Sequence, residues 1–320
     1  IMLCIVMGVM LLIFFVIGIV SLRQLKTLGT QAEKENDLSS KQWQTIRTIP
    51  KQIFEYAEDS NYIEHNIFPK LKITVKFRQV VKKNSEDQVY NSQEFEEILQ
   101  DLYVSFQEKG KKKFLAIILN FYLGLRAGEL AALQWGDITA THVHVQREMT
   151  CINEQQLKRE AYQQQIKNNQ LILLPNPKHN KYVYAVESHT KTHKERFVPI
   201  IPQAQNILDV LKSLSPCHKT NDYIFFEDES YMTTRSINSM LEYACEHIGR
   251  EPKRSHTIRR TYASRLATFG LPVDAIRSNL GHSNLATTYG YLYNPLTASE
   301  SLLIMEKAFS DLSQQVTTTF

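Results

Sequence analysis

Four short segments, far apart in the sequence, carry side chains that could act on an anionic substrate. They are Gly124–Leu130, Thr190–Arg196, His256–Arg260 and Leu280–Tyr291. Each contains arginine, lysine or histidine, and the last one ends in a tyrosine. Guanidinium and ammonium groups bind phosphate and carboxylate oxygens, and histidine transfers protons near neutral pH. The four segments therefore indicate a site for an anion at which protons could also move.

The first two segments also allow a purely structural interpretation. Arg126 lies in a turn between two apolar stretches, where the free N–H groups of a helix start would favour an anion. The alternative is that Arg126 pairs with Glu129 and only holds two helices together. Lys191 lies in a predicted hairpin turn, from which it could deliver a proton to a neighbouring site or simply face solvent. Neither segment decides between these alternatives by itself.

The last two segments carry histidines. His256 and Arg259 are three positions apart, so they share one face of a helix. A dense basic cluster surrounds them and is opposed only by Glu251; its other members are Arg250, Lys253, Arg254, Arg260 and Arg265. A histidine inside such a cluster favours a phosphate site over a solvated basic face. His282 follows a glycine at a predicted helix end, and Tyr291 comes nine residues later; each alone is more often structural.

Helices and a few short strands must position these residues. Asn91 and Glu94 fit an N-cap followed by an acidic N3 residue. A helix over 114–123 is expected to end at Gly124, and another begins near Ala127. Strands are predicted at 142–145, 182–187 and 196–201, with an extended insertion at 150–181, and further helices at 203–214, 233–248, 256–269 and 272–280.

The N-terminal segment, residues 1–20, has no charged side chain and is long enough to span a bilayer as a helix. Arg23 and Lys26 follow it, which by the positive-inside rule would leave the bulk of the chain in the cytoplasm. The alternative is an incomplete or misassigned start, because the chain opens on Ile1 instead of Met. A membrane anchor and an artefactual start therefore both remain open.

Residues 21–87 are predicted to be helical and polar and to end in a basic linker. Ser39 or Ser40 could cap a helix, along which Pro50 should introduce a kink or a break. Its apolar residues at roughly helical spacing are Trp43, Ile46, Ile49, Ile53, Phe54 and Ala57. A domain boundary is predicted after this linker, so that residues 88–320 form a second, larger domain.

The composition is that of a globular protein of 320 residues, 43% hydrophobic and 22% charged. This excludes a collagen, a wholly disordered chain and a disulfide-dense secreted scaffold. The charge balance, 37 − 33 = +4, says little about nucleic-acid binding, which depends on clustered charge. The four cysteines form no CxxC pair, so no zinc site is expected and the thiols are expected to be reduced, as in an intracellular protein.

In this order, Arg, Lys, His-x-x-Arg, Gly-His and Tyr resemble the motifs of the tyrosine recombinase, or phage integrase, family. The resemblance runs from about Asn91 to Tyr293 and includes Leu133-Gln134-Trp135-Gly136-Asp137-Ile138 and Arg196-Phe197-Val198-Pro199-Ile200. The segment Leu38–Pro69 is similar to the latter half of the family's helical core-binding domain. The chain departs from the pattern at its N-terminus and at Thr257 and Arg260, where the family commonly has Asp and His.

The resemblance implies a fold that is mainly α with a small antiparallel β-sheet (α+β). It divides the chain into the apolar segment 1–20, a partial, DNA-binding core-binding domain with linker at 21–87, and a catalytic domain at 88–320. The helix at Ser301–Ser313 resembles the one that family members dock on a neighbouring subunit. The implied partners are double-stranded DNA, further copies of the chain in a homotetramer, an accessory excisionase and, through residues 1–20, a membrane.

The resemblance also assigns catalytic roles. Tyr291 would attack a DNA phosphodiester, Lys191 would protonate the departing 5′-oxygen, and the remaining residues would bind the phosphate or assist Tyr291; the set is Arg126, Lys191, His256, Arg259, His282 and Tyr291. Tyr293 is the alternative nucleophile, and Tyr289 is expected to pack against the domain. Because the phosphotyrosyl bond preserves the energy of the broken bond, neither a metal nor another cofactor is expected.

The implied function is that of a site-specific DNA recombinase that integrates or excises a mobile element in a bacterial cytoplasm. Two alternatives remain. A type IB topoisomerase-like enzyme would share the chemistry but relax supercoils without exchanging strands. A non-catalytic or truncated DNA-binding remnant would bind DNA without cutting it.

Overall fold

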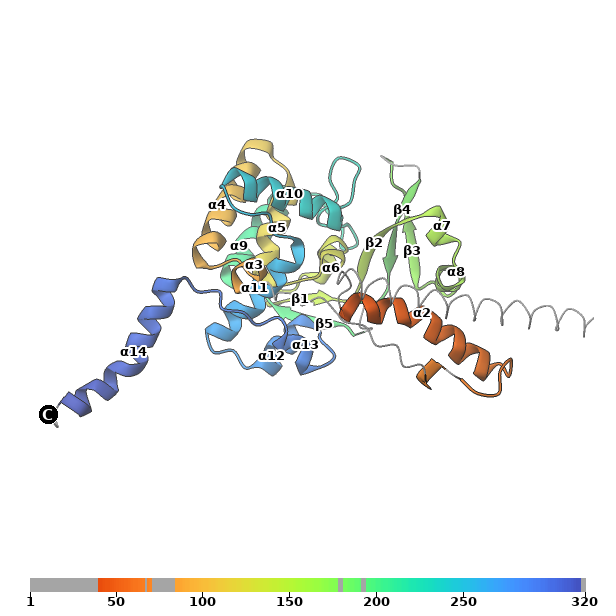
Figure 1. Ribbon diagram of the computed structural model, residues 1–320. Coiled ribbons are helices and arrows are strands. Elements are labelled where there is room, and N and C mark those ends of the chain that lie inside the picture. The colour runs from red at the N-terminus through yellow and green to blue at the C-terminus, as the bar shows by residue number, and fades with distance from the viewer. Residues whose placement is uncertain (1–39, 67, 71–83, 178–180, 191–193, 318–320) are drawn as a thin grey trace, which may run out of the picture. The chain divides into compact units, whose positions relative to one another are not determined.

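The structure is a computed structural model that describes residues 40–66, 68–70, 84–177, 181–190 and 194–317 (Figure 1). The chain forms two compact units, residues 1–82 and 83–320. The function assigned to each unit stays a prediction. Residues 1–20, which carry the anchor expectation, lie outside the described residues. Along the described ranges, no helix is both long and apolar enough to cross a bilayer.

The described part of the first unit is built on the helix α2 (Ser40–Asp59), followed by the short 3₁₀ helix η1 (Phe68–Lys70). Pro50 was expected to kink or divide this helix; it lies inside α2, which is not divided there and continues to Asp59. Phe54 is buried, and its ring lies 6.0 Å from that of Phe68. Ile49, predicted on the apolar face, is 65% exposed, so the buried face is narrower than the sequence suggested.

Helices make up most of the second unit. Their bounds are α3 Ser85–Gln88, α4 Ser92–Lys109, α5 Lys112–Leu123, α6 Ala127–Ala131, η2 Trp135–Asp137, α9 Pro202–Ser213, α10 Thr234–His247, α11 Ser255–Thr268, α12 Val273–Leu280, α13 Leu285–Tyr289 and α14 Ala298–Thr317. The predicted cap of α4 is present, because Asn91 accepts a hydrogen bond from the N–H of Glu94 while the Glu94 carboxylate accepts one from the N–H of Asn91.

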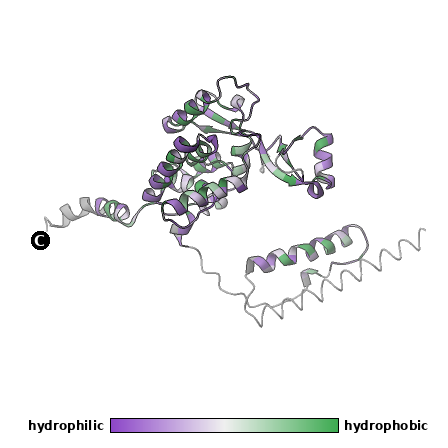
Figure 2. Cartoon of the chain, turned by 90° about the horizontal axis from the view of Figure 1, so that it is seen from above, coloured by the Kyte–Doolittle hydropathy of each residue, from purple (hydrophilic) through white to green (hydrophobic). Residues whose placement is uncertain are grey.

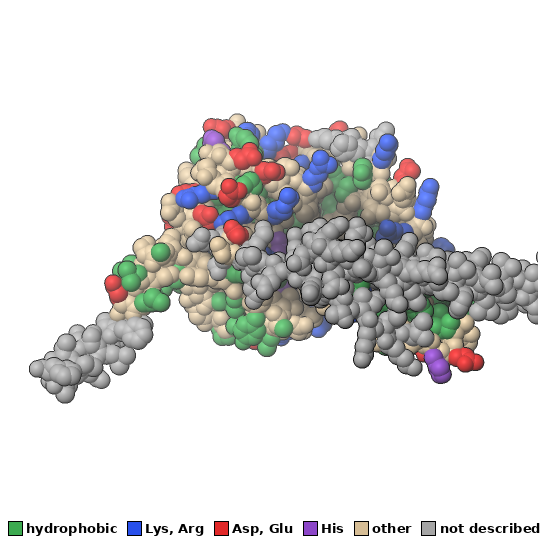
Figure 3. All heavy atoms as spheres, viewed as in Figure 1, with side chains coloured by type: hydrophobic (Ala, Val, Ile, Leu, Met, Phe, Trp, Pro, Cys, Tyr) green, Lys and Arg blue, Asp and Glu red, His purple; other side chains and the backbone are tan. Residues whose placement is uncertain are grey.

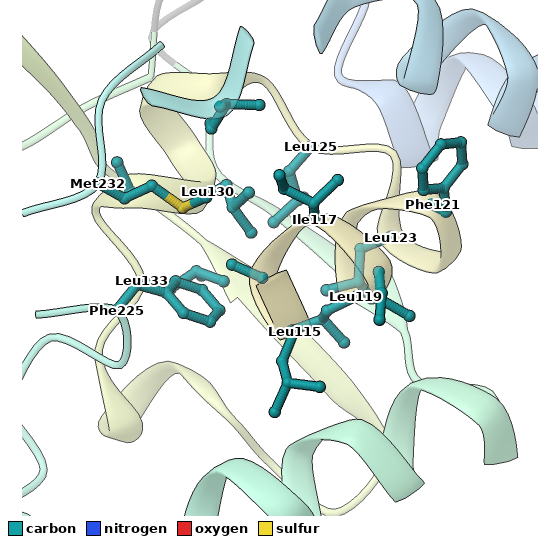
Figure 4. Close-up of a cluster of buried hydrophobic side chains, with 14 of the residues drawn as sticks. Leu115, Ile117, Leu119, Phe121, Leu123, Leu125, Leu130, Leu133, Phe225 and Met232 are labelled. Atoms are coloured by element: carbon teal, nitrogen blue, oxygen red, sulfur yellow. The ribbon is translucent and has the colours of Figure 1, made fainter. Parts of the chain in front are cut away.

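The core of the second unit surrounds α5, most of whose side chains are buried. Figure 4 shows Leu115, Ile117, Leu119, Phe121 and Leu123 of this helix among side chains from neighbouring loops and helices. Helices α4, α9 and α11 all pack on α5. Figure 2 shows helices of this unit that are apolar on one side and hydrophilic on the other. This core fixes the loop that follows α5, where the first of the four segments lies.

The strands form two small antiparallel sheets. In the first, β1 (His142–Val145) pairs with β5 (Arg196–Pro199), and Val145 lies opposite Arg196. In the second, the order is β2-β4-β3, with β2 at Glu148–Asn153, β3 at Leu171–Leu174 and β4 at Tyr182–Glu187. The predicted strands at 142–145 and 182–187 are confirmed, and the third predicted strand ends two residues early. The fold class, mainly α with small antiparallel sheets, is confirmed.

The segment 150–181 was expected to be an extended insertion and is instead a folded element. It contains the latter part of strand β2, the strand β3 and, between them, two short helices, α7 (Glu154–Leu157) and α8 (Glu160–Lys167). Asn153 caps α7, and Tyr162 and Ile166 pack on the sheet. Because this segment is rich in Gln and has few apolar residues, its helices could not be predicted from apolar spacing.

Candidate active site

The turn after α5 places Arg126 at the start of α6. Gly124 ends α5 with φ of +62°, a conformation that glycine adopts without strain. A Cβ at this position would lie 2.3 Å from the Tyr262 ring on α11, so the backbone approaches α11 closely there. Arg126 then donates its N–H to the Glu129 carboxylate at 2.8 Å and its Nη1 to the same group at 2.6 Å. The structural alternative for Arg126, a pair with Glu129, is therefore present.

Glu129 is more than the partner of Arg126. It is 1% exposed, and Arg196 donates Nη1 and Nη2 to its two oxygens at 2.9 and 2.7 Å. Arg259 Nη1 lies 3.9 Å from the same carboxylate. Burial alone would raise the pKa of Glu129, but the hydrogen bonds and charge of Arg196, with the charges of Arg259 and Arg126, lower it to about 2. Glu129 is thus an anion that three guanidinium groups share.

Arg259 connects the turn after α5 to the end of α12. It is 1% exposed and donates Nη1 to the Gly124 carbonyl at 2.7 Å and Nη2 to the Leu280 carbonyl. Its Nε has no hydrogen-bond partner among the described residues. Burial, together with the positive charges of Arg126 and Arg196, lowers the pKa of Arg259 to about 9. The negative charge of Glu129 acts in the opposite direction and raises it. A buried guanidinium with a free N–H favours the binding of an anion.

His256 and His282 are both neutral at physiological pH. Desolvation and the positive charges of Arg260, Arg259 and Arg126 lower the pKa of His256 to about 4. Desolvation and the charges of Arg259, Arg126 and Arg196, with a smaller effect of His256, lower the pKa of His282 to about 4.

The two imidazoles differ in exposure. His256 is exposed on the first turn of α11, whereas His282 is 6% exposed and its Nδ1 lies 3.1 Å from the Thr288 hydroxyl. His256 can therefore reach a substrate, and a neutral imidazole can accept a proton from it.

Tyr291 lies between these imidazoles. Its ring centroid is 4.9 Å from that of His256 and 4.7 Å from that of His282, with both rings edge-on. The Ser264 hydroxyl donates to the Tyr291 carbonyl at 3.0 Å, and the Tyr291 N–H donates to the Thr288 carbonyl at 2.8 Å. These contacts fix a tyrosine that lies outside a helix against α11 and α13.

The other two tyrosines of this segment differ from Tyr291. Tyr289, expected to pack against the domain, is 60% exposed, so that expectation was wrong. Tyr293 is half-buried, and its ring lies 5.8 Å from the Arg260 guanidinium. Of the three tyrosines, Tyr291 is the one that the structure brings against both His256 and His282. This arrangement favours Tyr291 over Tyr293 as the nucleophile, an assignment that stays a proposal.

Lys191 lies outside the described residues. The residues on either side of its segment are described: the Thr190 hydroxyl donates to the Lys194 carbonyl at 2.8 Å. From there the chain enters β5, whose first residue, Arg196, reaches Glu129. The role of Lys191 therefore stays a prediction from the sequence.

The basic cluster around His256 separates in the structure. Arg250 pairs with Glu97, Lys253 pairs with Glu94, and Arg265 lies over the Phe95 ring at 4.3 Å. Arg259 and Arg260 are the members of the cluster whose charges act on His256, so the cluster does not act as one phosphate-binding group. Arg196, in contrast, was not predicted for the site. The sequence feature that could have indicated a role for Arg196 is a single charged residue at the start of an otherwise apolar strand.

The arrangement has the groups needed for transfer of a phosphoryl group to a hydroxyl. Arg126 and Arg259 supply positive charge, and the salt bridges that the structure shows for them and for Arg196 all end at Glu129. One carboxylate shared by three guanidinium groups leaves an excess of positive charge, which an anionic phosphate would balance. Among the described residues, no cluster of three or more His, Cys, Asp or Glu could hold a metal ion.

The phage integrase family matches this chain over residues 88–297, which contain all of the residues described above. The chain belongs to the phage integrase family. The expected family is therefore confirmed, whereas the roles of the residues in the four segments stay predictions.

Two curated relatives give the scale of the similarity. The "Tyrosine recombinase XerC-like" of Caldanaerobacter subterraneus subsp. tengcongensis is 26% identical, over 78% of this chain and 61% of its own length. The "ICEBs1 integrase" of Bacillus subtilis is 24% identical, over 81% of this chain and 64% of its own length. The chain thus spans less than two thirds of these relatives.

Solved structures of other integrases have the same fold. The Tn1549 transposon integrase, in complex with a circular intermediate DNA, superposes with a TM-score of 0.60 at 20% identity, over 90% of this chain and 85% of that one. A lambda integrase dimer bound to a COC′ core site has a TM-score of 0.54 at 14% identity, over 84% of this chain and 63% of that one.

Proposed function

We propose that this protein is a site-specific DNA recombinase that cuts and rejoins DNA through a 3′-phosphotyrosyl intermediate. The observation that carries the proposal is the position of Tyr291: its ring lies against two neutral imidazoles, close to the buried arginines that Glu129 orders. Both structural neighbours described above were solved with DNA bound. A double-stranded DNA phosphate is the anion that fits this site.

In the cleavage step, the Tyr291 hydroxyl oxygen attacks a backbone phosphorus and the bond from phosphorus to the 5′-oxygen breaks. Neutral His256 accepts or orients the hydroxyl proton, and Lys191 gives a proton to the departing oxygen. Arg126 and Arg259 stabilise the charge that develops on the non-bridging oxygens. The terminal nitrogens of Arg259 each keep a second N–H that the carbonyl bonds do not use, so contact with phosphate remains open to it. His282 donates to the phosphate or positions Tyr291.

In the rejoining step, a 5′-hydroxyl from another strand attacks the phosphotyrosyl bond and releases Tyr291. The energy of the first bond is thereby kept, and no metal, nucleotide or other cofactor takes part in our scheme. Cutting one strand and joining another would integrate or excise a mobile element.

The assembly we propose is a homotetramer on DNA, with residues 21–87 as a DNA-binding domain and residues 88–320 as the catalytic domain. The first turns of α14 support the contact between subunits, because Leu302, Leu303, Ile304 and Met305 are all more than half exposed there. An excisionase would set the direction of the reaction. The protein would act in the bacterial cytoplasm.

A membrane contact through residues 1–20 is part of the proposal and has its own test. If the segment is an anchor, the full chain should fractionate with membranes and resist alkaline carbonate extraction. Deletion of the segment should release a protein that still binds DNA. A full chain that stays in the soluble fraction would rule out the anchor.

The proposed reaction is tested with a pool of nicked duplexes of randomised sequence, in which the fragment beyond the cleaved bond diffuses away and traps the intermediate. We expect a covalent protein–DNA adduct that survives denaturing electrophoresis, and joined products when a duplex with a free 5′-hydroxyl is added. Binding without an adduct would identify the non-catalytic remnant. Relaxation of supercoiled plasmid without exchange between duplexes would identify the topoisomerase-like enzyme.

A further inference from the structure

Arg260 has contacts that its place in the sequence does not explain. It departs from the family pattern noted above and follows the buried Arg259. On α11 it lies one turn after His256, so the two side chains share a face. It is half-buried.

The guanidinium of Arg260 lies between α3 and the tyrosine segment. Its Nη1 donates to the side-chain oxygen of Gln88, which is 8% exposed at the end of α3. Its Cζ lies 5.8 Å from the ring centroid of Tyr291 and 5.8 Å from that of Tyr293. A planar cation at this distance from two rings attracts both. Arg260 therefore links α3 to the segment that carries the proposed nucleophile.

A second contact holds the same segment to α11. Ser264, one turn beyond Arg260, donates its hydroxyl to the Tyr291 carbonyl and accepts the Tyr293 N–H, each at 3.0 Å. Ser264 thus fixes the backbone of the tyrosine segment. The rings of Tyr291 and Tyr293 instead contact Arg260, and the Tyr291 ring also contacts the two histidines. Removal of the Arg260 side chain should therefore change the positions of the Tyr291 and Tyr293 rings, while the backbone hydrogen bonds to Ser264 remain.

The charge of Arg260 also acts on His256. Among the described residues, the charged and titratable groups around this imidazole are Arg260 and Arg259 from α11, Arg126 from the start of α6, His282 from the end of α12 and Tyr291 after α13. After desolvation, Arg260 is the largest cause of the lowered pKa of His256, ahead of Arg259 and Arg126. Arg259 and Arg126 are ordered by Glu129, whereas Arg260 is held by the neutral amide of Gln88, so its charge is not offset there.

We propose that Arg260 is a positioning residue for the nucleophile: anchored on Gln88, it holds the Tyr291 ring beside His256 and places its positive charge next to that imidazole. Its catalytic consequence rests on the proposed function. Its effect on His256 can be measured without DNA.

The sign of the effect follows from the charges. Replacement of Arg260 by Gln removes a positive charge that disfavours the protonated imidazole, so the pKa of His256 should rise from about 4 toward its ordinary value of 6.5. A larger fraction of His256 is then protonated at mildly acidic pH and cannot accept a proton. Arg260→Lys keeps the charge and loses the planar group, so it separates electrostatics from ring packing.

The direct test is an NMR titration of the full chain labelled at histidine, with the His256 signal assigned by its absence in His256→Asn. We expect the pKa of His256 to rise by about one unit in R260Q and to change little in R260K. R265Q is the matched control, because Arg265 lies on the same helix but over the Phe95 ring. An unchanged His256 pKa in R260Q, with the other histidine signals as in the wild type, would contradict the proposal.

The second test is the pH profile of adduct formation with the nicked duplexes. In R260Q the acidic limb should move to higher pH by about one unit relative to wild type and R265Q. R260K should keep the wild-type limb but form adduct more slowly. If R260Q is slower at every pH with an unmoved limb, Arg260 is only structural. If the wild type forms no adduct, the proposed recombinase function fails, and the titration alone decides the role of Arg260 toward His256.

Discussion

Several side chains of this site carry a charge in a buried position, which is unfavourable in free energy. The carboxylate of Glu129 offsets this cost by pairing with the arginines. Glu129 binds Arg196 with both oxygens, contacts Arg126 and lies near Arg259. A buried charge is tolerated when it is paired and hydrogen-bonded. From the sequence, a pair between Glu129 and Arg126 was the alternative to a phosphate site. The structure shows that the same carboxylate can hold the arginines in place and leave them an excess of positive charge.

The buried imidazole of His282 predicts a loss of stability in acid. Because His282 has a pKa of about 4 in the folded chain and about 6.5 when unfolded, the unfolded state binds more protons between these values. Stability should therefore fall as pH drops from 6.5 to 4, by at most about 3 kcal/mol for this residue. Urea unfolding across this range should show a flatter pH dependence for His282→Gln than for the wild type.

Glu129 acts in a separate window of pH. Its pKa, lowered to about 2 from an ordinary value of 4.5, contributes stability that is present above 4.5 and lost as pH falls toward 2. His282→Gln should leave this lower window unchanged. A wild-type stability that is constant from pH 6.5 to 4 would contradict the assignment of neutral, buried imidazole to His282.

The proposed role of Lys191 predicts a rescue by the leaving group. Lys191→Ala should slow cleavage of ordinary DNA by about 100-fold or more, because general-acid help is lost. A duplex with sulfur at the 5′-bridging position needs no such help, so the variant should cleave it at close to the wild-type rate. Single-turnover rates on the two substrates measure this. Equal slowing on both would make Lys191 a phosphate-binding residue.

At the scale of elements, the end of α5 is where the fold and the site depend on each other most closely. Gly124 needs a positive φ and lies against Tyr262, while Gly110, which ends α4 with φ of +64°, has open space around it. We expect Gly124→Ala to destabilise the chain by about 3 kcal/mol or more, and Gly110→Ala by about 1 kcal/mol. Thermal unfolding of both variants compares them directly.

The same two variants separate the effect of backbone strain from the effect of moving the turn that carries Arg126. Both substitutions add a Cβ at positive φ, but only the one at Gly124 moves the turn that carries Arg126 and accepts a hydrogen bond from Arg259. Gly124→Ala should therefore also weaken phosphate binding, measured as DNA affinity. Equal effects of the two variants on stability would show that the contact with Tyr262 does not matter.

The sequence predicted those elements that have local signals. The capping residues Asn91 and Glu94 gave the start of α4, and apolar spacing gave most helices of the second unit. The helices of the insertion at 150–181 were missed, because their apolar face is short and its partners lie on strands distant in sequence. Spacing placed Tyr291 in the site, but no local signal could show that Tyr289 is exposed or that Arg196 reaches Glu129. Those facts depend on packing between α12, β5 and α6.

For the whole molecule, the net charge does not indicate where DNA would bind. On the face shown in Figure 3, acidic and basic side chains lie interspersed over α4 and α10. The net charge of +4 is small for a chain of this length. In our proposal, DNA is recognised by the ordered arginines of the site and by assembly.

Assembly predicts a role for α14, whose first turns expose apolar side chains. Leu303, which is 64% exposed, makes little contact within its own chain. Leu303→Asp should leave the melting temperature of the free protein unchanged and weaken formation of higher-order complexes on DNA. Analytical ultracentrifugation with and without duplex measures both. A variant that assembles like the wild type would exclude these turns of α14 from the contact between subunits.

The central claim, that Tyr291 forms a covalent bond to DNA, is tested by mass spectrometry of the trapped complex. The complex is digested with protease and nuclease, and the peptide that carries a nucleotide is sequenced. We predict the modification on Tyr291. Tyr291→Phe should form no adduct while binding DNA with nearly unchanged affinity, because phosphate contacts dominate binding; Tyr289→Phe and Tyr293→Phe should still form it. A nucleotide on Tyr293, or an adduct that persists in Tyr291→Phe, would contradict the account.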